Sequence, residues 1–212
     1  MIVAIAGLRS SAAQDALAAN LAVLRARQGR TICVVDTDPR RAAFTWGYAR
    51  GVAGVSPAIP ARTVSARSLS LEIESMRASY SDILISTGER DTQESRAALI
   101  AARLVLVPLD VGQVDLDAHY QLVARLNAAR MFNPGLRVLF VLIGPPGAPS
   151  PEDRAAIRVF VAHVMSASLA RTVIHAAPAC VYGQGRCLCD VETCDPESAA
   201  DMHALYDEVF IH

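Results

Sequence analysis

Two aspartates, Asp36 and Asp38, directly follow an apolar run at residues 31–35 and are well placed to do chemistry. That run, like an earlier one at residues 2–6, is typical of a buried parallel strand, so the carboxylates would lie at the carboxyl edge of a sheet. A small-residue loop and a predicted helix over residues 14–28 separate the two runs. A strand, a loop, a helix and a second strand in this order normally hold a phosphate group at the helix N-terminus. The N-terminal stretch therefore predicts a phosphate-binding framework.

A second group of reactive side chains lies near the carboxyl end of the chain. Cys180, Cys187, Cys189 and Cys194 fall within fifteen residues, and thiolates at this density could bind Zn²⁺ or an iron–sulfur cluster. Their spacing matches no common pair of CxxC knuckles. Cys187 and Cys189 also fall on a predicted strand, where alternate residues share a face and could be small core side chains. The sequence leaves both interpretations open.

Composition limits the classes of function. Of the 212 residues, 52% are hydrophobic and only 5% aromatic, which favours a core of Ala, Val, Leu and Ile between helices and a parallel sheet. The net charge of -1 gives no global basic field that would attract nucleic acid or an anionic membrane. All 20 basic residues are arginines, so a phosphate-binding lysine is impossible. We expect no signal peptide, no membrane span and a cytoplasmic location.

Strands and helices alternate along the rest of the chain. Apolar runs predict strands over residues 61–64, 83–85, 104–109, 136–143 and 172–174, and residues 51–62 read as mainly loop. Periodic apolar faces predict helices over residues 40–46, 68–79, 92–102, 115–129, 151–168 and 196–210. Gly29 suits the end of the first helix, and Ser150 suits an N-cap. This order predicts one α/β domain over residues 1–212, with a doubly wound, mostly parallel sheet flanked by helices.

Several short motifs follow one another in a characteristic order. They are Asn20-Leu21-Ala22, VVDTDP at residues 34–39, Thr45-Trp46, LVLVPLD at residues 104–110 and Asn133-Pro134. Together they resemble the ParA/MinD superfamily of deviant-Walker P-loop ATPases, and most closely the small plasmid-partition ParA proteins. The resemblance covers nearly the whole chain. It implies a P-loop NTPase-like fold, and an ATP- and Mg²⁺-dependent role in plasmid partition or a related positioning process.

The resemblance places the family's phosphate-binding loop, KGGxGKTT, on residues 9–16. In chain order these are Arg9, Ser10, Ser11, Ala12, Ala13, Gln14, Asp15 and Ala16. Arg9 stands where a signature lysine reaches a partner's phosphates, and it could keep that charge. Gln14 stands where a lysine bridges the β- and γ-phosphates, and Asp15 where a threonine binds Mg²⁺. Serine and alanine in place of glycine disfavour positive φ.

The family's second acidic segment is altered as well. Ser86 stands where the family carries the aspartate linked to Mg²⁺, and only Asp36 and Asp38 remain of its acidic set. The resemblance implies that Asp36 positions water and metal, and it would be the catalytic residue if the protein hydrolyses ATP. The alternative is structural, because an aspartate at the end of a strand can cap the next helix or hold a loop.

These substitutions predict a ParA-like partition or positioning protein of a plasmid or mobile element with a degenerate nucleotide site. It would be a pseudo-ATPase that holds no cofactor and acts mainly by binding proteins. The expected partners are a second copy of the chain across the old nucleotide face, an adaptor or centromere-binding-type protein, and non-specific DNA. The candidates for DNA contacts, with scattered, solvated arginines as the alternative, are Arg40, Arg41, Arg154, Arg158 and Arg171.

Two other functions remain open on the sequence. One is an active, divergent Walker-type ATPase that binds ATP and Mg²⁺ and segregates DNA, with Arg9 supplying the lost charge. The other is a metal-stabilised scaffold built on the four clustered cysteines. The five histidines stand in no motif and predict ordinary surface or core side chains.

Overall fold

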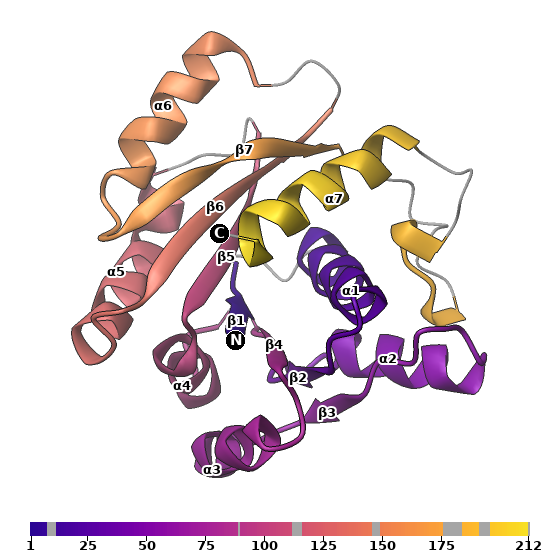
Figure 1. Cartoon of the computed structure of the whole chain (residues 1–212). Coiled ribbons are helices and arrows are strands. Elements are labelled where there is room, and N and C mark those ends of the chain that lie inside the picture. Colours follow the sequence, from indigo (N-terminus) through magenta and orange to yellow (C-terminus); the bar gives the residue numbers. More distant parts are fainter. Residues whose placement is uncertain are drawn as a thin grey trace.

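A computed structural model describes residues 1–7, 12–88, 90–111, 116–145, 149–175, 184–190 and 196–211, with the backbone alone at residues 66 and 116–119. These residues form a seven-stranded sheet in the order β3-β2-β4-β1-β5-β6-β7, with every pair of neighbouring strands parallel (Figure 1). The strands are β1 (Ile2–Ile5), β2 (Ile32–Asp36), β3 (Ala61–Thr63), β4 (Asp82–Ser86), β5 (Leu104–Asp110), β6 (Arg137–Gly144) and β7 (Ala167–His175).

Helices cover both faces of the sheet, which confirms the predicted doubly wound α/β fold (Figure 1). One face packs against α3, α4, α5 and α6, and the other against α1, α2 and α7. The helices are α1 (Ala12–Arg27), α2 (Ala42–Val52), α3 (Ala66–Arg77), α4 (Gln93–Ala101), α5 (Leu116–Phe132), α6 (Pro151–Val161) and α7 (Pro196–Phe210). None of the helices in the described part of the chain has the length and apolarity to cross a membrane.

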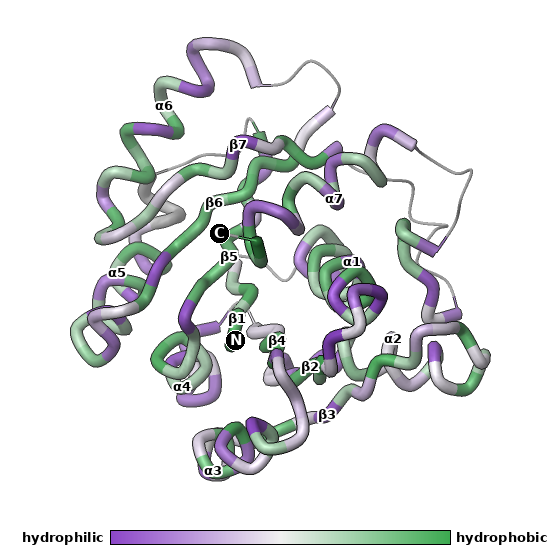
Figure 2. Tube along the Cα trace, in the orientation of Figure 1, coloured by the Kyte–Doolittle hydropathy of each residue, from purple (hydrophilic) through white to green (hydrophobic). Residues whose placement is uncertain are grey.

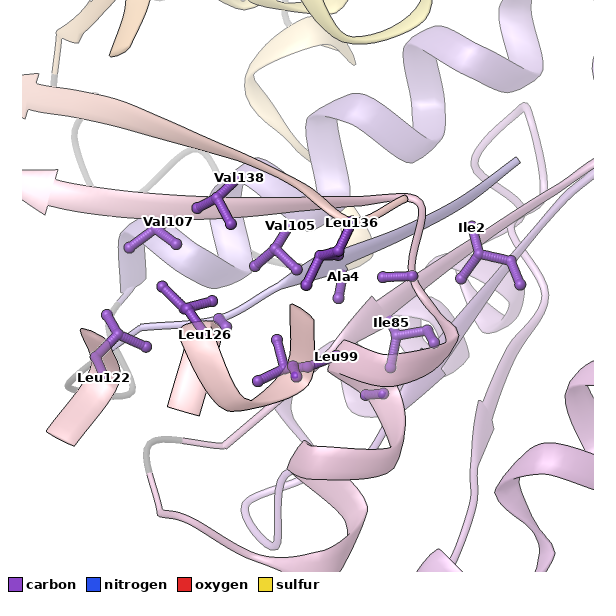
Figure 3. Packing of buried hydrophobic residues seen from close by; sticks show 14 of the residues in the cluster. Ile2, Ala4, Ile85, Leu99, Val105, Val107, Leu122, Leu126, Leu136 and Val138 are labelled. Carbon is purple, nitrogen blue, oxygen red and sulfur yellow. The ribbon is translucent and has the colours of Figure 1, made fainter. Parts of the chain in front are cut away.

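The core follows from the runs of branched apolar residues in the strands. β1, β2 and β4 are buried along their whole length, as expected of strands covered on both faces. Figure 2 shows hydrophobic residues, in green, along the central strands of the sheet. On one face Leu99 of α4 and Leu122 and Leu126 of α5 lie beside Val105 and Val107 of β5 (Figure 3). Large aliphatic side chains of α4 and α5 therefore face inward, and the opposite flanks of these helices face solvent.

The predicted helix ends agree with the structure at two positions. Gly29 takes φ 74°, the left-handed conformation in which glycine ends a helix at no steric cost, and it follows α1. Ser150 caps α6 through a reciprocal pair of bonds with Asp153, whose backbone N–H donates to the serine hydroxyl at 3.1 Å. Both residues set where a helix stops or starts, as predicted.

The predicted helix over residues 151–168 is wrong at its carboxyl end. α6 stops at Val161, Ser166 adopts φ 56°, and residues 167–175 form the edge strand β7 in register with β6. The predicted strand at residues 172–174 is only the end of this strand. The loop predicted over residues 51–62 begins two residues too early, because α2 continues to Val52. The predicted strand around Cys187 and Cys189 is also wrong, since residues 188–190 form a short 3₁₀ helix.

Candidate functional site

The candidate site lies where three neighbouring strands end, beside the first turn of α1. Ile5, Asp36 and Ser86 close β1, β2 and β4 and are matched in register across the sheet. Ligands of open α/β sheets bind at this carboxyl edge. Arg9, Ser10 and Ser11 lie outside the described residues, whereas Ala12, Ala13, Gln14, Asp15 and Ala16 form the start of α1.

Gln14 points into the protein and holds the strand ends together. Its side chain is 1% exposed, and its Nε2 donates to the backbone carbonyl of Ile5 at 2.9 Å and to that of Thr87 at 2.5 Å. The Thr87 hydroxyl donates to the same Ile5 carbonyl at 3.1 Å. The amide therefore bridges β1 and the segment after β4. In this conformation it is directed at backbone carbonyls, which are acceptors like a phosphate oxygen.

Asp15 lies on the next position of α1 and faces other acidic groups. Burial, foremost, raises the pKa of the Asp15 carboxyl from 3.8 to about 6. Arg40 opposes this rise, with its Nη2 3.9 Å from Asp15 Oδ2, while the carboxylates of Asp36 and Asp38 add to it. Negative charge is thus already costly at this point, which disfavours a further anion.

Asp36 makes the contacts of a structural aspartate. It is buried, and its two oxygens accept from the backbone N–H groups of Asp38 and Phe44 at 2.9 Å each, which holds the turn and caps the first turn of α2. Burial raises the pKa of Asp36, against the pull of these backbone bonds. Asp38 accepts from the backbone and the guanidinium of Arg40 at 3.0–3.1 Å. These are the contacts of the structural alternative stated for both aspartates.

The described side chains do not fit a magnesium nucleotide. Ser86, at the position of the family's metal-linked aspartate, is buried and carries no charge, and its carbonyl accepts from Thr37. Both oxygens of Asp36 already accept backbone bonds. Among the described residues no group of three or more His, Cys, Asp or Glu side chains is arranged to hold a metal ion.

A cavity of about 380 Å³ adjoins this edge of the sheet and is lined largely by apolar groups. Alanines of α1 line one part of the cavity, and the larger side chains that also line it are Trp46, Ile143 and Met202. Two polar residues also line it, Asp15 and His175, and the His175 Nδ1 lies 2.6 Å from Asp201 Oδ2. The sequence did not single out His175, because its partner is 26 residues away on α7 and shares no motif with it.

The cysteine cluster is only partly described. Cys180 and Cys194 lie outside the described residues, so the predicted four-cysteine metal site stays a prediction. Cys187 is buried and Cys189 half-buried. A hydrogen bond from Cys187, foremost, lowers the pKa of the Cys189 thiol, and Arg27 adds to this effect, whereas the same bond and burial raise the pKa of Cys187.

A buried arginine fixes the segment that carries these cysteines. Arg50 of α2 is 0% exposed and donates to both carboxylate oxygens of Asp190, at 2.6 and 3.0 Å. It also donates to the carbonyls of Gly185, Ser56 and Pro57 at 2.7–3.0 Å. This bidentate contact joins α2 to residues 184–190.

The predicted DNA contacts are spread over separate elements. Arg154 and Arg158 lie one turn apart on the exposed side of α6, and Arg171 is exposed on β7. Arg40 is engaged by Asp38 and Asp15.

Comparisons with known proteins place this fold. No family model matches the chain, and no curated protein matches its sequence. Solved structures do match. The structure of apo McdA from Cyanthece matches with a TM-score of 0.73 and 13% identity, and 98% of each chain is covered. MinD in a MinC:MinD complex from Aquifex aeolicus matches with a TM-score of 0.70 and 14% identity, over 100% of this chain and 96% of that one. A plasmid partition protein of Borrelia burgdorferi bound to AMPPNP matches with a TM-score of 0.68 and 12% identity, over 99% of this chain and 97% of that one.

The chain has the fold of these McdA, MinD and plasmid partition structures. This fold agrees with the resemblance carried by the sequence motifs, and at 12–14% identity it is the fold alone that these structures share with this chain. The functions of these three proteins therefore do not transfer directly to this chain and can only support a proposal.

Proposed function

We propose that this chain is a ParA-like partition or positioning protein whose nucleotide site is degenerate and which acts by binding other proteins. The observation that supports this most is Gln14. A lysine at that position of the family reaches outward to the β- and γ-phosphates, whereas Gln14 is buried and donates to the carbonyls of Ile5 and Thr87. The partition protein bound to AMPPNP has the same fold, so loss of binding would come from side chains and not from topology.

Charge at the same edge supports the proposal. A triphosphate beside the N-terminus of α1 would meet the carboxylates of Asp15, Asp36 and Asp38. Two unit charges about 4 Å apart repel by about 4 kcal/mol at the effective dielectric constant near a protein surface. Arg40 is already shared between Asp15 and Asp38, which leaves less of its charge for a phosphate group. The edge thus favours neutral or cationic neighbours over nucleotides.

The partners proposed here are a second copy of the chain, an adaptor or centromere-binding-type protein, and non-specific DNA. The MinC:MinD complex shows a protein of this fold that assembles with a second protein. Contacts with DNA would be weak and strongly salt-dependent, because they would depend on a few arginines of α6. The double variant Arg154→Glu and Arg158→Glu should then abolish the electrophoretic mobility shift of non-specific duplex DNA at low salt.

Titration of the full chain with ATP and Mg²⁺ by isothermal calorimetry tests the proposal. We expect no saturable heat of binding at nucleotide concentrations up to about 1 mM. A dissociation constant of about 1 mM corresponds to a binding free energy of only about 4 kcal/mol. The matched control carries Gln14→Lys, Asp15→Thr and Ser86→Asp, which restores the family's residues, and should bind more tightly than the wild type.

Saturable binding to the wild type would refute the degenerate site. If turnover accompanies it, depends on Mg²⁺ and disappears in Asp36→Asn, the chain is the divergent Walker-type ATPase instead. Circular dichroism of each variant separates a lost site from a lost fold.

A further inference from the structure

A groove of about 450 Å³ runs between the outer flanks of α4 and α5. Ile100 lines its α4 side, and Tyr120 and Phe132 line its α5 side. Ile100 is 39% exposed, Tyr120 72% and Phe132 76%, although these are large apolar or aromatic side chains. Exposed aromatic groups around one depression are typical of a surface that another molecule covers.

The floor of the groove is suited to a helix. Ala124 and Ala128 are exposed and stand one turn apart on α5, between the larger side chains at its ends. Small residues allow a second helix to lie close, at the 8–10 Å axial separation of packed helices. From residue 120 to residue 132 the lining of α5 extends over about 18 Å, which matches about three turns of a partner helix.

Arg125 gives the groove its charge preference. Its Nε is buried and has no hydrogen-bond partner in the part of the chain that the structure describes. No carboxylate of the described residues forms an ion pair with it, whereas Arg96, the other basic group of the groove, is paired with Asp91 at 2.6 Å. Burial lowers the pKa of Arg125. A buried donor without a partner is costly. Arg125 as a whole is half-buried and lines the groove, so a carboxylate from outside could pair with its guanidinium.

We propose that the groove between α4 and α5 binds an amphipathic helical segment of a partner protein, with apolar side chains on the aromatic rim and one Asp or Glu on Arg125. This deepens the proposed function, on which it rests, by giving the surface and the chemistry of the partner. The occupant is acidic because Arg125 forms no ion pair in the described part of the chain, and helical because small and large side chains line the groove along about three turns of α5. Such segments anchor through residues at i, i+3, i+4 and i+7.

A designed peptide of about three turns tests this surface. It carries leucines at i, i+4 and i+7 and a glutamate that faces Arg125, and a matched peptide carries glutamine instead. Fluorescence anisotropy with the full chain should show at least about tenfold tighter binding of the glutamate peptide, the usual value of a hydrogen bond to a charged group. Arg125→Gln should remove that difference.

A pair of variants separates the groove from the rest of the surface. Ala128→Glu places bulk and negative charge on the floor and should abolish binding, whereas Ala156→Glu makes the same change on the exposed side of α6 and should leave it intact. Both positions are exposed helix positions that accept glutamate, so folding should be kept, as circular dichroism would check.

Three results would overturn the inference. They are no saturable binding of the glutamate peptide, equal affinity for the two peptides, and equal loss in the two alanine variants. Sedimentation equilibrium adds a fourth: if the wild type dimerises and Ala128→Glu is monomeric, the occupant is a second copy. ATP is absent from the peptide-binding experiments. Nucleotide binding by calorimetry would therefore refute the degenerate site without affecting the peptide test, and failure of peptide binding would not affect the calorimetry.

Discussion

Replacing Asp15 by asparagine should stabilise the protein at neutral pH. The carboxyl has a folded-state pKa of about 6, mainly because burial disfavours its charged form, against 3.8 for a free aspartate. A shift of this size corresponds to about 3 kcal/mol at most, at about 1.4 kcal/mol for each pKa unit. The side chain is 30% exposed, and the N-terminus of α1 favours a carboxylate by about 0.3–1 kcal/mol. We therefore expect a gain of about 1–2 kcal/mol from Asp15→Asn.

The pH dependence of this gain follows from linkage. Between pH values near 3.8 and 6 the native state binds more protons at Asp15 than the unfolded state does, so the wild type loses stability as the pH rises through this window. Asparagine does not titrate. The two proteins should therefore be equally stable near pH 4, diverge as the pH rises to about 6, and stay a constant distance apart above about pH 7.

Urea denaturation followed by circular dichroism, repeated across this pH range, measures the difference. Asp207→Asn, on the exposed side of α7, is the matched control and should change the free energy of unfolding by less than about 0.5 kcal/mol. A variant less stable than the wild type at neutral pH would refute the reasoning. So would a gain of the same size near pH 4, because protonated aspartic acid and asparagine carry the same charge.

Three further changes have outcomes that denaturation can measure. Arg50→Met should cost about 3–5 kcal/mol because it leaves the buried carboxylate of Asp190 without its main partner, whereas Arg154→Met on the exposed α6 should be near neutral. Ser150→Ala should cost about 0.5–2 kcal/mol by removing the α6 cap. Hydrogen bonds from β7 lower the pKa of Glu208 in the folded state. Glu208→Gln should therefore cost stability above the unfolded pKa of about 4.5 and progressively less as the pH falls below it. Equal loss of stability at all pH values would contradict this.

The central strands could be predicted because both of their faces are buried. Such strands are apolar through their middle, and β1, β2 and β4 carry short runs of Ile, Val and Leu there, with polar residues only at the ends of β2 and β4. The edge strand β7 could not be predicted in the same way. It is buried only in part, its residues include Ala, Leu and Arg, which also suit a helix, and its start depends on the conformation of Ser166.

The location of the site could be predicted, but the direction of its side chains could not. Strand order alone places Asp36 and the start of α1 at one edge of the sheet. The inward turn of Gln14 depends on the carbonyl of Thr87, which is 73 residues away in sequence. The contact between His175 and Asp201 likewise joins β7 to α7 without any local pattern. Contacts of this kind are set by packing between elements, which a periodic pattern does not record.

Gln14 and Asp15 together explain why restoring a single residue should not restore a nucleotide site. Successive residues of a helix point about 100° apart, so when Gln14 faces the strand ends Asp15 must face the mouth of the site. A lysine at position 14 would have to give up the carbonyls of Ile5 and Thr87 and would still stand beside a carboxylate. A threonine at position 15 would remove that charge but leave position 14 turned inward. Both changes are therefore needed together, and Gln14→Lys alone should destabilise the strand ends without gaining affinity for ATP.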